Sequence, residues 1–263
     1  MKLLHEPLSG RSQAVLGVVG VVGTGLVWEG LIRSGLLDVA GLPLPSGVLG
    51  GVGDLLPDET FWDAVLFTLG EWMLGLAIAT VVGVLVGGLM GAFRSVFLTF
   101  EWPVEAFRVL PSVAVGPILV LLIGQGILPL ALTVALACVW PILLNTMYGV
   151  RGTDSTAVMT AKTFGNGDLA VLRKVKIPSA LPFAFTGVRI AASIGLLVAV
   201  SAELLIGSGD GIGGYILTNT VNATNLDVVY AATLVAGLLG VAVNMVMAKL
   251  DDVVFGWKKG LAQ

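Results

Sequence analysis

The chain has 263 residues, of which 56% are hydrophobic and only 12% are charged, and its net charge is -3. With a mean hydropathy of +0.98, a water-soluble protein of this size could not bury its apolar surface, so the composition indicates a membrane protein. The acidic balance argues against a nucleic-acid partner. One cysteine and one histidine exclude an intrachain disulfide and a histidine metal site, and Cys138 is expected to be a small buried apolar residue.

Six apolar runs predict six membrane-spanning helices, because a helix needs about 20 apolar residues to cross a bilayer. The charge-free run from Val109 to Val150 would extend about 63 Å as one helix, so it is expected to fold back at Gly124–Gly126. The first run has the basic start of a signal peptide, but no clear cleavage site follows it. The predicted spans cover residues 13–33, 64–93, 104–123, 127–149, 190–206 and 228–248.

Lysine and arginine gather on one side of this predicted topology, in the N-terminus, the 94–103 and 150–180 loops and the C-terminus. They include Lys2, Lys258 and Lys259. The other side carries aspartates and glutamate, and no lysine or arginine beyond Arg33 at the end of the first span. Basic residues in short loops stay in the cytoplasm. We therefore expect a multi-pass protein of the inner or plasma membrane with both termini cytoplasmic.

The predicted external loop, residues 34–63, contains a short helix. Pro43 and Pro45 force an extended backbone at its start. The apolar spacing from Val48 to Leu56 then fits an amphipathic helix that lies along the external face.

The 151–180 segment is the largest predicted cytoplasmic loop. Asp154 can cap a helix that ends near Phe164, and Gly165 can end that helix in a left-handed conformation. Asp168 can cap a second helix that continues to Lys176.

Two prolines, Pro178 and Pro182, are expected to interrupt this second helix before the fifth span. Connectors between spans are usually shorter and less organised than this helix–glycine–helix loop. A docking element for a cytoplasmic partner is therefore predicted, with a simple connector as the alternative.

Seven residues of the loop carry a known pattern: Met159, Thr160, Ala161, Gly165, Val175, Ile177 and Pro178. The pattern resembles the loop of ABC importer permeases, in which Glu-Ala-Ala precedes a glycine by three residues and Ile-x-Leu-Pro follows it after nine. The last alanine, the glycine and the proline match, while Met159 and Thr160 stand where the family has glutamate and alanine. A charged contact from position 159 is therefore not expected.

The resemblance covers residues ~40 to 255 in one register. The Phe107–Pro117 stretch, the Ile177–Pro182 run, Ala202-Glu203 and Gly211–Gly213 are similar to the branch that imports nitrate, sulfonates, taurine and related compounds. The resemblance implies an all-α, polytopic type I ABC importer permease fold. It implies one permease domain over residues 1–263, which moves a small polar or anionic solute.

The chain contains no Gly-x-x-x-x-Gly-Lys-Ser/Thr, so it is not expected to bind ATP through a P-loop, and it is not an enzyme on this reading. The resemblance implies a separate ABC ATPase that holds ATP and Mg, an external substrate-binding protein and a second permease copy, with membrane lipid around them. No cofactor is expected in this chain. Closure of the ATPases would move the loop and rock the spans between inward and outward access.

Nine loop residues are the predicted contacts to the ATPase: Val158, Met159, Thr160, Ala161, Phe164, Gly165, Leu169, Ile177 and Pro178. Glu203 is the first candidate for a gate or pathway residue, because ionisable residues in spans are costly and tend to be functional. An interfacial carboxylate, hydrated or capped by backbone amides, is equally open. Asn145 and Ser201 could line a pathway or form interhelical hydrogen bonds.

A glycine repeat in the second span, Gly83, Gly87 and Gly91, permits close helix approach, either within the chain or at a dimer interface. A membrane-embedded enzyme would need paired acids, a histidine-rich metal set or a serine–histidine arrangement, and the spans give no sign of these. A secondary transporter or channel without an ATPase is the alternative; it would show inverted repeats or broken helices. The organised loop favours the ABC permease.

Overall fold

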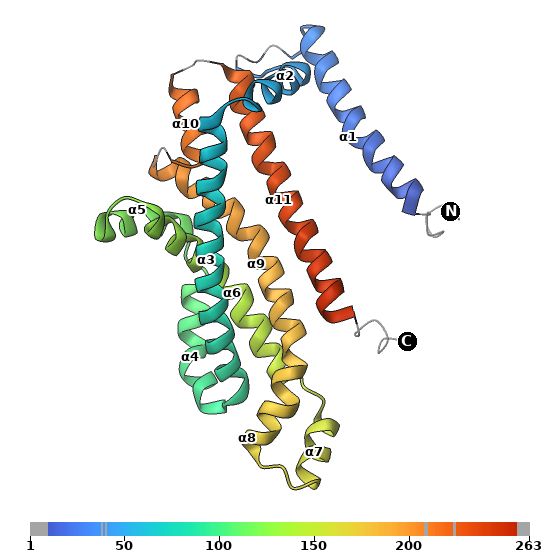
Figure 1. Cartoon of the computed structure of the whole chain (residues 1–263), viewed down its shortest axis with the longest axis vertical. Helices are drawn as coiled ribbons and strands as arrows, with labels where there is room; N and C mark the ends of the chain where they lie inside the picture. The colour runs from blue at the N-terminus through green and yellow to red at the C-terminus, as the bar shows by residue number, and fades with distance from the viewer. Residues whose placement is uncertain (1–9, 38, 40, 208–209, 223–224, 257–263) are drawn as a thin grey trace. The chain divides into compact units, whose positions relative to one another are not determined.

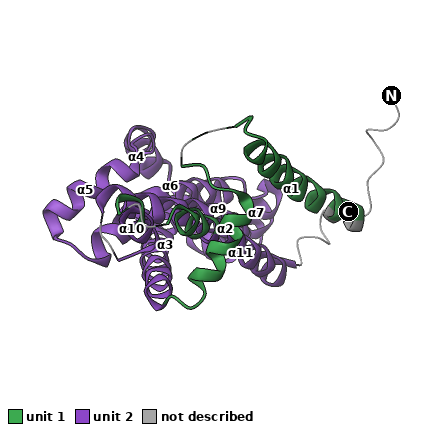
Figure 2. Ribbon diagram, turned by 90° about the horizontal axis from the view of Figure 1, so that it is seen from above, with its two compact units in different colours: residues 1–58, 219–234 green, residues 59–218, 235–263 purple. Residues whose placement is uncertain are grey.

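The computed structural model describes residues 10–37, 39, 41–207, 210–222 and 225–256, and these residues form helices joined by turns. This confirms the all-α class. The chain divides into two compact units, residues 1–58 with 219–234, and residues 59–218 with 235–263 (Figure 2). Lys2, Lys258 and Lys259, which contribute to the predicted orientation, lie outside the described residues.

The first unit contains α1 (Gly10–Arg33), α2 (Pro45–Leu55) and the start of α11 (Leu226–Phe255). The short helix predicted after the two prolines is thus confirmed as α2. It starts at Pro45, whose fixed φ suits a first helical turn and whose missing N–H is not needed there. A Cβ at Gly51 would stand 2.6 Å from the Asp227 carbonyl oxygen, so glycine lets α2 lie directly on the backbone of α11.

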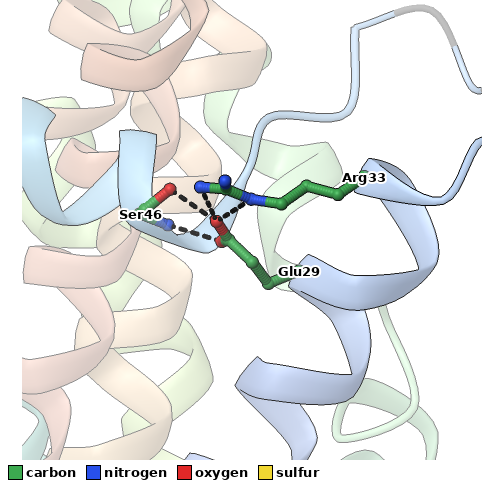
Figure 3. A network of polar contacts seen from close by, with 3 residues as sticks. All are labelled: Glu29, Arg33 and Ser46. Atoms are coloured by element: carbon green, nitrogen blue, oxygen red, sulfur yellow. Dashed lines mark hydrogen bonds and ion pairs between the residues drawn. The ribbon is translucent and has the colours of Figure 1, made fainter.

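Glu29 of α1 ties α1 to α2 (Figure 3). Its carboxylate accepts hydrogen bonds from the Ser46 backbone N–H (3.0 Å) and the Ser46 hydroxyl (2.8 Å). It also accepts one from Nε of Arg33 (2.8 Å). Leu44, which precedes α2, offers no side-chain cap. Glu29 therefore supplies the acceptor and the negative charge that a helix N-terminus favours, from a distant point in the sequence.

The second unit is built on three long helices that pack along one another: α3 (Glu59–Ala92), α6 (Ile127–Arg151) and α9 (Ile177–Ile206) (Figure 1). Trp72 donates from Nε1 to the Ala192 carbonyl (2.8 Å). Cys138 is fully buried and its thiol lies 3.2 Å from the Ala191 carbonyl. It is therefore the small buried core residue that was predicted.

The glycine repeat of α3 packs within the chain, against α6. A Cβ would stand 2.9 Å from the Ile142 side chain at Gly83 and 2.7 Å from that of Val150 at Gly91. At Gly87 it would overlap the Leu143 carbonyl. Since α6 already covers this face of α3, internal packing is the correct one of the two alternatives.

The predicted third span differs from the structure. Residues 94–123 form α4 (Arg94–Phe107) and α5 (Ser112–Ile123), bent by 93° at a short break. Pro111 lacks an N–H and disfavours helical backbone at Leu110, so no continuous helix runs from α4 into α5. The described chain therefore has five helices long and apolar enough to cross a membrane, and six if this bent pair is one span.

Two expectations about the fifth span are wrong. The helix runs on from α8 (Asp168–Val171) through a π-helical turn, η1 (Leu172–Lys176), into α9. Pro178 and Pro182 therefore do not interrupt it: the wider π turn makes room for the ring of Pro178 in the turn that follows, and Pro182 lies within α9. Asp168 does not cap a helix but pairs with Lys162 (2.8 Å), which ties α8 to α7 (Ser155–Thr163).

Candidate functional site

The loop between α6 and α9 is folded, and it begins with a capped helix. The Asp154 carboxylate accepts a hydrogen bond from the Thr156 backbone N–H (2.8 Å). This satisfies one of the free donors at the start of α7. The predicted N-cap is confirmed.

The end of α7 is a Schellman motif, centred on Gly165 at φ +78. The Gly165 N–H donates to the Lys162 carbonyl (2.9 Å), and the Asn166 N–H donates to the Ala161 carbonyl (3.2 Å). These are the two bonds that define the motif. The Asn166 amide also donates to the Ala161 carbonyl (2.9 Å). The glycine turn was predicted, and the structure confirms its left-handed backbone.

Large apolar side chains of the loop point away from the protein. The exposed fraction is 61% for Met159, 82% for Phe164 and 77% for Leu169. We call these three residues the apolar patch. Beneath them, Val171 is 2% exposed and anchors α8. The loop therefore has a packed underside and an unpartnered outer side.

The other predicted loop contacts divide between two places. Val158 and Ala161 are half-buried on α7, while Thr160 is exposed. Ile177 and Pro178 lie at the start of α9 and are exposed, away from the turn that carries the patch. The predicted contacts on α7 and α8 thus lie together, whereas Ile177 and Pro178 belong to the spanning helix.

Glu203 is fully buried at the far end of α9 from the loop. Its carboxylate accepts hydrogen bonds from the Thr68 hydroxyl of α3 and from the Gly213 backbone N–H at the start of α10 (Ile212–Val221), both at 2.7 Å. A Cβ at Gly211 would overlap this carboxylate. Glu203 is therefore buried and not interfacial, one of its two donors is a backbone amide, and its carboxylate joins three helices.

A second acid, Glu71, lies beside Glu203 and was missed in the sequence. Glu71 is fully buried on α3, one turn after Thr68, and its carboxyl group interacts with that of Glu203. Among the described residues neither of its carboxyl oxygens has a hydrogen-bond partner. An acid inside an otherwise uncharged predicted span was the available signal. The expectation that the spans hold no paired acids is therefore wrong.

Substituting the two acids should have opposite effects on stability. Glu203→Ala leaves the Gly213 N–H buried without an acceptor and opens a cavity, which should lower the free energy of unfolding by about 3 kcal/mol. Glu71→Gln removes a buried acid that lacks a partner, and should leave stability equal or higher. Thermal unfolding in detergent measures both. Equal losses in the two variants would contradict this account of the pair.

Asn145 and Ser201 bond within their own helices. Asn145 donates to the Pro141 carbonyl and Ser201 to the Leu197 carbonyl, both at 2.8 Å. One of the two alternatives for these residues was an interhelical hydrogen bond, and neither forms one among the described residues. Neither side chain takes part in the hydrogen bonds of Glu203.

The long apolar helices are those of a multi-pass membrane protein. The sequence pattern of the binding-protein-dependent transport system inner membrane component matches residues 64–255, and the chain belongs to this family of ABC importer permeases.

Individual relatives cover most of the chain. A putative ABC transporter permease protein of Methanocaldococcus jannaschii is 30% identical over 213 residues, which are 81% of this chain and 77% of the relative. The taurine transport system permease protein of Escherichia coli is 28% identical over 256 residues, or 95% and 92%. The crystal structure of an amino acid ABC transporter with histidines matches with a TM-score of 0.62 at 12% identity, over 73% of this chain and 92% of that one. This last match is a likeness of fold.

Proposed function

We propose that the chain is the translocation subunit of an ATP-driven importer and works as one transmembrane permease domain over residues 1–263. A separate ABC ATPase, with ATP and Mg, would dock on the 151–180 loop at the cytoplasmic face. A binding protein would deliver the solute on the side of the 34–63 loop, and a second permease copy would complete the pathway. Both termini would then be cytoplasmic, as the distribution of basic residues favours.

The observation that carries this proposal is the apolar patch. Met159 and Phe164 are exposed outside the apolar spans, and Leu169 is exposed at the first turn of the Asp168–Ile206 run. Burial of each in a protein groove would contribute on the order of 1.5–3 kcal/mol. The loop beneath is held in one shape by the Gly165 motif and the Lys162–Asp168 ion pair. A rigid element with an unpartnered apolar side suits a docking partner.

The continuity of α8, η1 and α9 gives this docking element a mechanical role. No break separates the loop from the span, so a displacement of the loop passes along one helix to Glu203. Rigid-body movement of packed helices is a common way to alternate access. Glu203 is the proposed gate residue, and Asn145 and Ser201 are proposed pathway residues.

The proposed substrate is a small polar or anionic solute, such as taurine, another sulfonate or nitrate. Supporting this class is the taurine permease of Escherichia coli, which aligns with 95% of the chain. The alternative is a secondary transporter or channel that needs no ATPase.

A docking experiment separates these functions. Phe164→Asp with Leu169→Asp places two charges where apolar burial is proposed, and should reduce the co-purified ATPase and ATP-dependent uptake at least tenfold. Ser155→Asp adds a charge at the first turn of α7, where an acid is favourable, and serves as the control.

All variants should reach the membrane in equal amounts. Wild-type ATPase recovery and uptake in the double variant would overturn the proposal. Uptake that continues without any ATPase would favour the secondary transporter.

A further inference from the structure

An apolar groove of about 240 Å³ lies where the last turns of α3 and α6 meet the start of α9. Its floor is made of small residues, including Gly88, Ala180 and Ala184, and the two alanines are buried. Its walls are large and exposed: Leu89 is 49% and Leu181 50% accessible. Because small residues lie between large ones, this face of the second unit has a groove.

The interior of the groove offers no polar group to a ligand. Thr146 carries the one polar side chain in the lining, and its hydroxyl donates to the Ile142 carbonyl of its own helix (2.7 Å). An occupant must therefore be apolar along its length, because a polar group placed here would find no hydrogen-bond partner.

Basic residues adjoin, in the sequence, the lining residues at the end of the groove next to the loop. Leu172 and Ile177 line the groove, and the residues between them include Arg173 and Lys176. Phe93 lines it on the α3 side and Arg94 follows directly.

These cations are available to a ligand. Among the described residues neither Arg94 nor Arg173 forms an ion pair, whereas Lys162 is engaged by Asp168. A groove with an apolar interior and a cationic end matches one fatty chain attached to an anionic head group.

We propose that this groove binds an anionic phospholipid of the adjacent leaflet, with one acyl chain over Gly88 and the phosphate near Arg94 and Arg173. A second copy of the chain would bring the same basic residues to the same end, which is repulsive, whereas a phosphate neutralises them. The bound lipid contacts the π turn between loop and span. The proposal does not depend on which solute is transported.

Native mass spectrometry of the full chain, released from bilayers of equal phosphatidylcholine and phosphatidylglycerol, tests this site. We expect wild type to retain phosphatidylglycerol at least fivefold over phosphatidylcholine. Arg94→Gln with Arg173→Gln should abolish that preference. Gly88→Phe, whose side chain enters open space, should lower retention of both lipids at least fivefold. Gly237→Phe on α11, equally open and outside the groove, should retain lipid as wild type does.

A second measurement uses wild-type protein alone. Phosphatidylglycerol with a photoreactive group in the acyl chain should label the last turns of α3 and the first turns of α9. Equal retention of the two lipids by wild type would overturn the proposal, as would labelling that avoids these turns. Efficient disulfide formation between two Gly88→Cys copies would assign the groove to a copy of the chain instead.

Discussion

Gly87→Leu should prevent the permease from accumulating in a folded state, whereas Gly88→Leu should leave folding intact. The two glycines are neighbours on α3, but a Cβ at Gly87 would overlap the Leu143 carbonyl of α6, and one at Gly88 would meet nothing within 4 Å. A backbone carbonyl cannot rotate away as a side chain does, so α3 and α6 would have to separate. We expect a loss on the order of 3 kcal/mol or more at Gly87.

Fluorescence-detected size-exclusion chromatography of membrane extracts measures this difference directly. A finer comparison uses alanine at both positions, since alanine improves helix propensity equally in each by about 0.5–1 kcal/mol. Gly88→Ala should then raise the melting temperature and Gly87→Ala should lower it. If the Gly87 and Gly88 variants fold and melt alike, with leucine and with alanine, α3 and α6 do not make this contact in the membrane.

Gly165→Val should insert normally yet lower ATP-dependent uptake at least tenfold. The glycine holds a left-handed backbone at φ +78, and a Cβ at this position would meet nothing within 4 Å. The expected loss therefore comes from the backbone and not from a steric clash with a neighbour. The left-handed conformation costs a residue with a Cβ about 1–2 kcal/mol, and a β-branched side chain makes it worse. The α7–α8 turn would then favour other shapes.

Two controls make the test specific. Gly165→Asn should retain most uptake, because asparagine tolerates the left-handed region. Gly167→Val lies two residues away, also in open space, but its backbone is extended at φ -68 and ψ 168. Valine suits that conformation, and uptake should be unchanged. A Gly165→Val permease that matches Gly167→Val in uptake would show that the turn geometry does not matter for coupling.

Features set by neighbouring residues were predictable from the sequence. The Asp154 cap, the Gly165 turn and the α2 helix each follow from a few adjacent residues, and the structure has all three. The long apolar runs likewise predicted the spanning helices. Pro111 gave a local signal for a kink, but the charge-free run that contains it favoured one span over two separate helices.

Features that join distant parts of the chain were not predictable. The contact of Glu71 with Glu203 depends on how α3 packs against α9, and the Glu29–Ser46 bonds depend on how the segment between α1 and α2 folds back. Periodicity and propensity carry no information about either. The π turn was also not predictable. Pro178 indicated the end of a helix, and a single sequence does not reveal a widened turn that accommodates a proline.

The helix is continuous from Asp168 to Ile206, so a displacement at one of its ends would be passed to the other. Its 39 residues form a rod about 58 Å long, so a tilt of about 5° at the loop would carry the far end through about 5 Å if the rod were stiff. That far end is fastened to α3 and α10 by the two hydrogen bonds of Glu203. If α3 and α10 stayed in place, a displacement of the loop would have to bend the helix at η1 or break the hydrogen bonds of Glu203. In the proposed transport cycle, the stiffness of the π turn would then set how much of a loop displacement reaches the opposite end of the helix.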